Sequence, residues 1–416
     1  MIENALIRPF KVLHLVLDSG ERLPCLVDSA TWLPARVATR WAVRYRRYRL
    51  QSSTLADNLR VLCRMYTWAR LVGRFDLDDY LTSGKLLRPG QIESLVSYLR
   101  TENKRLTPGK RAEHTGSIVQ VLKAETYDHH LAIIEDFLKW SLDPENRGGV
   151  SSLTLDQMYT ERTRLELLFQ TYYIGTPESE RIEPLTDAEL LAIRKAIEPI
   201  KDDGGQWTFP RSGFAEYTRF RNWLMFQTAL ELGLRRGELL KLRIDSLPRG
   251  PEDWIVVRRY PDDPLDPRPK EPAVKTSERI IPASDELRSA LRAYYMTPPP
   301  LGRMRGYSIY LFVTRTGATL SLDRADDIIQ TIGKISGVQP LSWHRLRHTW
   351  AENTARRLSN EPNWLDQLMY LGGWSHPASV SWYTKRFRQE QGNEALRKRQ
   401  DGLYDRKEIQ DEDNFG

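Results

Sequence analysis

The chain has 416 residues, of which 62 are Lys or Arg and 55 are Asp or Glu, so its net charge is +7 at pH 7. This length allows two domains with good cores, and the basic excess weakly favours a polyanionic partner. Only two cysteines are present, Cys25 and Cys63, which excludes a disulfide framework or a four-cysteine zinc site. No uncharged apolar run approaches the roughly 18 residues of a membrane span, and the N-terminal residues lack a signal-peptide pattern. We therefore expect a cytoplasmic protein that does not bind membranes.

Residues 1–50 are predicted to form an N-terminal extension. Loosely alternating apolar residues before Asp18-Ser19-Gly20 favour a short strand or hairpin over a helix. The stretch ARVATRWAVRYRRYRL, residues 35–50, then interleaves arginine with tryptophan and tyrosine, and these groups suit phosphate contact and base stacking. A solvated basic helix face is the alternative. The candidate DNA contacts are Arg40, Arg44, Arg46 and Arg47.

Residues 51–174 are predicted to form a helical domain. TLADNLRVLCRMYTWARLVG has apolar residues at helical spacing, with Thr54 as the expected N-cap and Gly73 as the stop. IESLVSYLR and TYDHHLAIIEDFLKW predict two more helices. The polar segment GTPESERIEP, residues 175–184, contains glycine and proline and is predicted to be a linker.

Residues 185–416 are predicted to form a second domain of mixed structure. Thr186 and Glu189 have the spacing of a capping box that begins a helix. A helix is expected over 216–232, strands in DWIVVRR, RIIPA and IYLFVT, and helices from about residue 344 to the tail. A proline-rich loop, PDDPLDPRPKEP, separates the first two strands. The expected fold class is therefore mainly α with a small antiparallel β-sheet in the second domain, an α+β arrangement.

Four short segments of the second domain contain the candidate catalytic residues. In LELGLRRGELLKLR, Arg235 precedes a helix and Glu238 follows three residues later, a spacing that is usually an ordinary helical ion pair. In AVKTSERIIP, Lys275 lies at a turn before a strand. Taken singly, neither residue indicates a function.

The third and fourth segments add histidines, an aromatic pair and a further arginine. In LSWHRLRHTWAENTARR, His344 and Arg347 lie on one helix face, and His348 follows. A zinc site on the two histidines is disfavoured, because the metalloprotease pattern needs glutamate where Arg345 stands. In LMYLGGWSHPASVSWYTK, Tyr383 follows Trp374 by nine residues.

The ordered set G-L-R-x-G-E, Lys before a strand, H-x-L-R-H, L-G-G-W and Tyr resembles the catalytic domain of the tyrosine recombinases, the phage integrase family, over roughly residues 184–395. The resemblance implies an all-helical core-binding domain followed by an integrase-type catalytic domain. It also implies that Tyr383 is the nucleophile and Lys275 the general acid. The remaining roles that it implies are phosphate binding by Arg235 and Arg347, proton transfer at His344, a pocket position for Trp374, support of Arg235 by Glu238, and a supporting role for His348.

Two departures from the family pattern leave alternatives open. The loop before Lys275 is longer and richer in proline than usual, so Lys270 is a rival for the general acid. His376 is a rival for the pocket position of Trp374, although the nine-residue spacing to Tyr383 favours the tryptophan.

These residue types suit strand cleavage at a phosphodiester. Guanidinium groups match phosphate oxygens bidentately, a phenol needs a base or positive charge to attack, and a 5′ oxygen leaves readily only when it is protonated. The scheme needs no metal or nucleotide cofactor, and the chain has no G-x-x-x-x-G-K-[ST] motif.

The resemblance implies a site-specific recombinase that cleaves and rejoins DNA through a 3′-phosphotyrosine intermediate, which we expect to serve a mobile element. The implied partners are double-stranded DNA with paired recombination sites, other copies of the chain in a homotetramer on DNA, and an accessory DNA-bending protein. Such a protein would work at the nucleoid. The alternatives are a type IB topoisomerase, which relaxes DNA by the same chemistry, and a DNA-binding protein that has lost catalysis.

Overall fold

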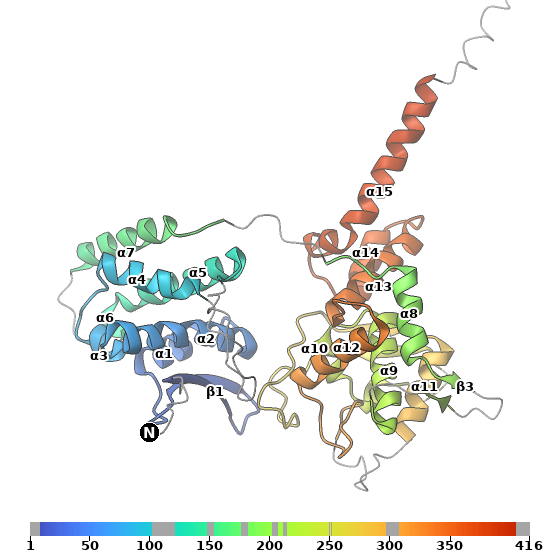
Figure 1. The fold of residues 1–416 in the computed structure, drawn as a ribbon, viewed down its shortest axis with the longest axis horizontal. Helices are drawn as coiled ribbons and strands as arrows, with labels where there is room; N and C mark the ends of the chain where they lie inside the picture. Colours follow the sequence, from blue (N-terminus) through green and yellow to red (C-terminus); the bar gives the residue numbers. More distant parts are fainter. Residues whose placement is uncertain are drawn as a thin grey trace, which may run out of the picture. The chain divides into compact units, whose positions relative to one another are not determined.

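The computed structural model describes residues 9–101, 121–147, 154–175, 182–201, 207–210, 214–248, 250, 252–296 and 308–404. The chain divides into two compact units. The first comprises Met1–Glu180 and Asp262–Glu271, and the second comprises Arg181–Pro261 and Pro272–Gly416 (Figure 1). Of the predicted linker, residues 176–181 lie outside the described residues, as does the C-terminal tail from residue 405.

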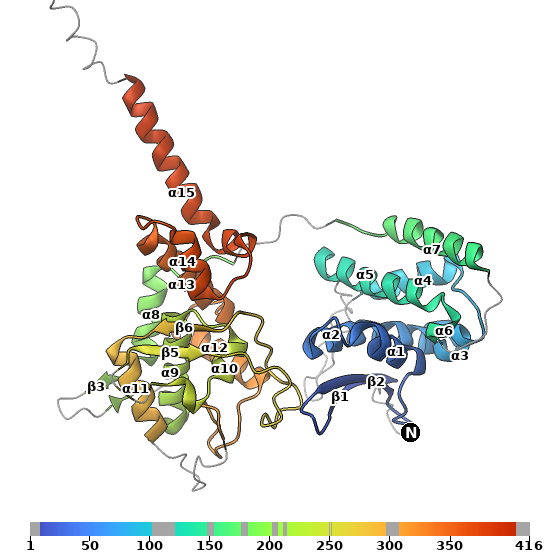
Figure 2. The same ribbon diagram turned by 180° about the vertical axis from the view of Figure 1, so that it is seen from behind.

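The first unit begins with an antiparallel hairpin, as the alternation of its sequence predicts. Strands β1 (Phe10–Val16) and β2 (Arg22–Asp28) pair from Phe10↔Asp28 to Val16↔Arg22, and helix α2 packs against both strands (Figure 2). The helical segments that follow are α1 (Arg36–Arg40), the π-helix η1 (Trp41–Arg46), α2 (Ser52–Trp68), the π-helix η2 (Ala69–Gly73), α3 (Leu77–Thr82), α4 (Pro89–Arg100), α5 (Ala124–Ser141), α6 (Pro144–Arg147) and α7 (Leu155–Gln170).

The hairpin and the helices share one hydrophobic core. Phe10 and Leu26 of the strands are buried in the same cluster as Leu59 of α2 and Phe137 of α5. Residues from Phe10 onward are therefore an integral part of the first unit, because the strands bury their apolar face against the helices.

The predicted N-cap of α2 is wrong. The helix begins at Ser52, with Gln51 in extended backbone conformation as the N-cap residue, so Thr54 lies inside the first turn. The Leu55 amide donates to the Gln51 carbonyl oxygen at 2.9 Å. The first helical hydrogen bond therefore spans Thr54, which places Thr54 inside the helix and not at its cap.

The second unit contains helices packed around small strand pairs. Strands β5 (Trp254–Val257) and β6 (Arg279–Pro282) pair antiparallel from Trp254↔Pro282 to Val257↔Arg279, as their sequences predict. The other elements are α8 (Asp187–Ile197), β3 (Ile200–Lys201), β4 (Trp207–Thr208), α9 (Glu216–Leu232), α10 (Arg236–Lys241), the 3-10 helix η3 (Ile244–Ser246), α11 (Asp285–Met296), α12 (Leu322–Ser336), α13 (Trp343–Leu358), α14 (Trp364–Gly372) and α15 (Pro377–Tyr404).

The predicted strand IYLFVT does not form as an independent strand. It makes only isolated bridges, at Tyr310 and Val313. Its main chain pairs instead with the residues after α10, because the Ile244 amide donates to Ile309 and the Leu311 amide donates to Leu242, at 2.9 and 2.8 Å. A short irregular segment thus satisfies these backbone groups in place of a sheet.

Helix α13 organises the part of the second unit that contains the predicted site. It packs against α9, α14 and α15, and its Trp350 is buried with Leu368, Trp374 and Phe387 in a cluster of their own. Helix α15 continues beyond this cluster, and its residues 388–401 are exposed (Figure 1). None of the described helices combines the length and hydrophobicity that a bilayer crossing requires. The predicted fold class, mainly helical with small antiparallel sheets, is confirmed.

Candidate active site

Arg235 and Glu238 are connected through the main chain at the start of α10. Arg235 is the N-cap residue, and its backbone amide donates to Glu238 Oε2 at 2.7 Å. Glu238 thereby satisfies one of the free amides of the helix N-terminus. The arrangement fixes the backbone from which the Arg235 side chain extends.

The ion-pair partner of Glu238 is Arg279, the first residue of β6. Arg279 Nη1 and Nη2 lie 2.7 and 3.1 Å from the two carboxylate oxygens, and the Thr276 hydroxyl donates to Oε1. Burial alone would raise the pKa of Glu238, but Arg279, Arg347 and the Thr276 hydrogen bond lower it to about 2. Glu238 is therefore a buried carboxylate whose charge is balanced by arginine.

Sequence reasoning missed Arg279, although a signal was present. In β6 the buried positions are Arg279 and Ile281, and Ile280 is exposed. Strand alternation in RIIP therefore places a charged residue on the inward face, which requires a buried partner.

Arg347 of α13 is fully buried and is held by two carbonyl oxygens. Its Nη1 donates to Gly233 and its Nη2 to Gly372, both at 2.6 Å. Its Nη1 also lies 3.8 Å from Glu238, and its guanidinium carbon lies 4.4 Å from the centre of the Trp374 ring. Contacts from two distant sequence segments thus fix the orientation of this guanidinium.

Gly373 allows the loop after α14 to approach the turn before β6. It has a φ of +64°, and an added Cβ would lie 2.9 Å from both Arg279 Nη1 and Thr276 Cβ. Its carbonyl oxygen accepts the Ser277 amide at 3.2 Å. Glycine is favoured here because a side chain would be strained and would collide with the buried ion pair.

The Tyr383 ring of α15 lies among the side chains of α13 and the loop after α14. Its centre is 4.3 Å from that of His348, 5.0 Å from that of Trp374 and 5.6 Å from that of His344. The Arg347 guanidinium carbon lies 5.8 Å from the same ring. The structure therefore brings together the predicted tyrosine, tryptophan, arginine and both histidines.

Both histidines favour the neutral form. Burial, then His344 and Arg347, lower the pKa of His348 to about 4. Desolvation, then Arg347 and Arg235, lower the pKa of His344, although part of its side chain reaches the surface. A neutral imidazole can accept a proton from a phenol. Among the described residues, no group of three or more His, Cys, Asp or Glu is arranged to hold a metal ion.

Four buried nitrogen atoms around Tyr383 and Arg235 have no hydrogen-bond partner within the described ranges. They are Arg235 Nη1, Arg347 Nε, His348 Nε2 and Trp374 Nε1. Buried polar groups are normally satisfied, so such a group of atoms indicates a site for a ligand with several acceptor oxygens. A phosphate has these oxygens, and guanidinium groups match them.

Lys275 is exposed and makes no hydrogen bond or ion pair among the residues that the structure describes. Its neighbour Thr276 donates to Glu238, so the backbone beside Lys275 is attached to the buried ion pair. The rival Lys270 belongs to the segment Asp262–Glu271, which packs in the first unit. The rival His376 is exposed, whereas Trp374 is buried against Tyr383.

The basic segment of the first unit is partly engaged in ion pairs. Arg46 donates to Asp136 at 2.9 Å, and both guanidinium nitrogens Nε and Nη2 of Arg47 donate to Glu21. Within the described part of the chain, the Arg44 side chain has one hydrogen bond, a 3.5 Å contact with the Glu145 carbonyl oxygen. Arg40, at the end of α1, is partly exposed. Arg40 and Arg44 are thus the less constrained cations of the four.

Comparisons with known proteins agree with this fold. Residues 212–390 match the model of the phage integrase family, a range that includes Arg235, Lys275, His344, Arg347 and Tyr383. This part of the chain is therefore similar to the phage integrase family, and the predicted resemblance to tyrosine recombinases is confirmed. The match supports a part in DNA recombination. No curated protein matches the sequence.

Solved structures are similar at low sequence identity. The Tn1549 transposon integrase in complex with transposon right end DNA is 15% identical, covering 86% of this chain and 99% of that chain with a TM-score of 0.50. XerH site-specific recombinase bound to its difH substrate is 15% identical, covering 82% and 79% with a TM-score of 0.47. A lambda integrase dimer bound to a core site is 15% identical, covering 83% and 75% with a TM-score of 0.46. The similarity to the transposon integrase shows a shared fold.

Proposed function

We propose that this chain is a site-specific DNA recombinase whose nucleophile is Tyr383. The Tyr383 oxygen attacks the phosphorus of a DNA strand, the bond from phosphorus to the 5′ oxygen breaks, and a 3′-phosphotyrosyl ester forms. The phenol proton passes to a neighbouring histidine, and Lys275 protonates the departing 5′ oxygen. A 5′ hydroxyl of another strand reverses these steps and completes the exchange.

The observation that carries this proposal is the grouping of Tyr383 with unpartnered buried donors. The phenol ring lies beside His348 and Trp374, and Arg347 is fixed 5.8 Å away. The unpartnered nitrogens of Arg235, Arg347, His348 and Trp374 suit the oxygens of a phosphate whose negative charge increases on attack. The Thr276 hydroxyl donates to Glu238, so the backbone beside Lys275 is attached to the buried ion pair of the site. This attachment supports Lys275 rather than Lys270 as the general acid.

We assign the remaining roles from the family and from charge. The first unit, with Arg40 and Arg44 as its least constrained basic contacts, serves as the DNA-binding domain, and the second unit is catalytic. The match to the phage integrase family supports a homotetramer on paired sites; a lambda integrase tetramer has been solved on a Holliday junction. The Tn1549 integrase was solved with transposon right end DNA, and we assign this chain to a mobile element that recombines with the help of a DNA-bending protein.

Covalent capture from a random pool tests the proposal for any target sequence. Duplexes with a randomised centre and a nick beside it are incubated with the full chain, and DNA that stays attached to protein in detergent is sequenced. Wild-type protein should retain DNA of a common sequence. Tyr383→Phe should retain none while shifting the same DNA in a gel.

The recovered duplex then separates the alternatives. Two differently labelled copies should exchange strands in the presence of wild-type protein, whereas relaxation of supercoiled DNA without recombinants would identify a topoisomerase. Absence of an adduct with wild-type protein would identify a DNA-binding protein without catalysis and would overturn the proposal.

A further inference from the structure

The proline-rich loop before Lys275 belongs structurally to the first unit. Asp262–Glu271 stands between β5 and β6 in the sequence but packs in the unit that contains the β1–β2 hairpin. The chain therefore enters the first unit at residue 262 and leaves it at residue 271. Lys275 follows only four residues after this exit.

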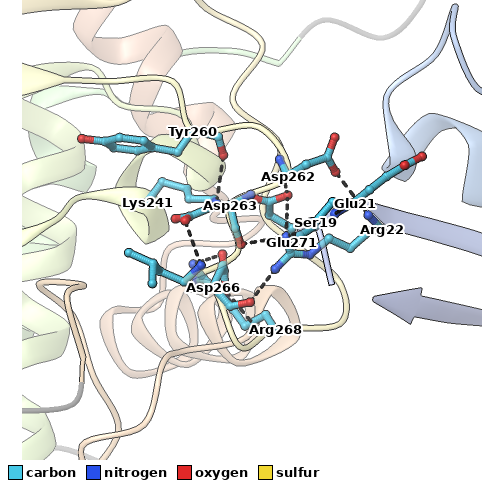
Figure 3. A network of polar contacts seen from close by, with 12 residues as sticks. Ser19, Glu21, Arg22, Lys241, Tyr260, Asp262, Asp263, Asp266, Arg268 and Glu271 are labelled. Carbon is cyan, nitrogen blue, oxygen red and sulfur yellow. Dashed lines mark hydrogen bonds and ion pairs between the residues drawn. The ribbon is translucent and has the colours of Figure 1, made fainter. Parts of the chain in front are cut away.

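Arg22, the first residue of β2, is the centre of the loop's contacts (Figure 3). Its side chain is buried, and its guanidinium donates to the carbonyl oxygens of Asp263, at 2.8 Å, and Asp266. It also donates to the carbonyl oxygen of Gly20 and lies 3.7 Å from the Glu271 carboxylate. One planar group thus connects the hairpin to two turns of the loop.

The loop is closed by its own side chains. Glu271 accepts the backbone amides of Asp262 and Asp263, at 3.0 and 3.2 Å, so the two ends of the segment are held together. The Asp266 carboxylate accepts both Nε and Nη2 of Arg268, at 2.7 and 2.8 Å. The segment therefore behaves as one compact piece around Arg22.

Gly20 makes the close contact between the hairpin turn and the loop. Its φ is +89°, and an added Cβ would lie 2.3 Å from the Asp262 carbonyl oxygen and 2.7 Å from the Pro264 nitrogen. The backbone of the turn and the backbone of the loop are thus in direct contact, which only glycine allows.

We propose that Arg22 is a positioning residue for Lys275, acting through the loop 262–271. Lys275 is exposed and lacks a side-chain partner among the described residues, so its position depends on its backbone. On one side Thr276 is bonded to Glu238, and on the other side Glu271 is bonded within the Arg22 loop. Because the loop closes through Glu271 four residues before Lys275, its order limits the backbone conformations open to the residues that lead to Lys275. This inference rests on the proposed function of Lys275 as the general acid.

The test compares two versions of the captured duplex that differ in one atom. The first has the normal 5′ oxygen at the cleaved bond and the second has sulfur there. A thiol has a pKa of about 8.5 and leaves without a proton donor, whereas an alcohol is nearly as weak an acid as water and leaves poorly unless it is protonated. Only cleavage of the oxygen duplex therefore depends on a well-placed acid.

Arg22→Ala in the full chain should form the adduct about tenfold or more slowly on the oxygen duplex, since a general acid contributes roughly 10²–10⁴-fold. On the sulfur duplex it should match wild type, as Lys275→Ala should. Glu271→Gln, which leaves the hairpin intact, should show the same pattern more weakly. Arg36→Ala is the matched control, because Arg36 is an exposed arginine of the same unit whose side chain pairs with the exposed Asp79.

Two results would overturn the role of Arg22. One is an equal loss on both duplexes, which would indicate a purely structural effect, and the other is a wild-type rate on both. Hydrogen exchange on the DNA-free protein gives a second readout: Arg22→Ala should increase amide exchange in residues 262–278 and leave α13 unchanged. No increase there would overturn the inference. Absence of an adduct with wild-type protein would instead overturn the proposed function.

Discussion

Glu238 and Arg279 form an ion pair in which both side chains are excluded from solvent, with Arg279 Nη1 2.7 Å from Glu238 Oε1. Arg279 also donates from Nε to the Leu371 carbonyl oxygen at 2.7 Å. The pair therefore connects the start of α10, the start of β6 and the end of α14. These three segments carry or adjoin Arg235, Lys275 and Trp374.

Replacing Arg279 should strongly destabilise the second unit. Arg279→Ala leaves Glu238 buried without its main cation, and breaking such a pair costs about 3–5 kcal/mol. Chemical denaturation of the full chain measures this as a lower midpoint for the second unit. Arg324→Ala is the control, because Arg324 forms an exposed pair with Asp327 in the same unit, and it should change the free energy of unfolding by less than about 0.5 kcal/mol.

The second unit should lose stability as the pH drops through a range set by His348. Its pKa is about 4 in the folded chain against 6.5 in the unfolded chain. The unfolded state therefore binds a proton first, so the stability that the neutral ring contributes is complete above pH 6.5 and is lost as the pH falls towards 4. The loss should be on the order of 3 kcal/mol at most.

Comparison with a variant isolates this contribution. His348→Gln cannot titrate, so its free energy of unfolding should depend less on pH between 6.5 and 4 than that of wild type. Parallel curves for the two proteins in urea denaturation across this window would show that His348 does not cause the effect. Below pH 4.5 both proteins should lose further stability. The pKa of Glu238 is about 2 in the folded chain against 4.5 in the unfolded chain, so the stability that its charge contributes is present above pH 4.5 and is lost as the pH falls towards 2.

The close approach at Gly373 should make it sensitive to a single methyl group. Gly373→Ala places a Cβ 2.9 Å from Arg279 Nη1 and Thr276 Cβ at a φ of +64°, and the backbone strain alone costs about 1–2 kcal/mol. Gly337→Ala has the same kind of strain, with a φ of +74°, but its Cβ meets nothing within 4 Å. Thermal denaturation should show a larger loss for Gly373→Ala, and equal losses would mean that the contact is unimportant.

Arg235 should matter for the rate of strand cleavage more than for folding. Its Nη1 has no partner among the described residues, so little native interaction is lost in Arg235→Lys. Loss of one preorganised donor to developing negative charge costs roughly 10²–10³-fold in rate. The rate of adduct formation on the captured duplex measures this. Arg236→Lys is the control, since Arg236 pairs with Asp326, and should cleave at a rate close to wild type.

The sequence by itself indicated most of the elements and most members of the candidate site. Periodicity placed α9, α13 and the β5–β6 pair, because a helix or strand exposes its faces with a fixed period. Spacing of short motifs selected Arg347, His348, Trp374 and Tyr383, and the structure brings these side chains together. Local geometry was sufficient here, since each motif lies on one element or at its end.

Tertiary structure decided the partners that come from distant segments. Glu238 is paired with Arg279 rather than with the Arg235 side chain, and IYLFVT pairs with the residues after α10 rather than forming a strand. The proline-rich loop folds around Arg22, 240 residues away in sequence from Asp262. Such choices depend on which buried charge or free backbone group finds a partner when the elements pack, and no local period of the sequence encodes that.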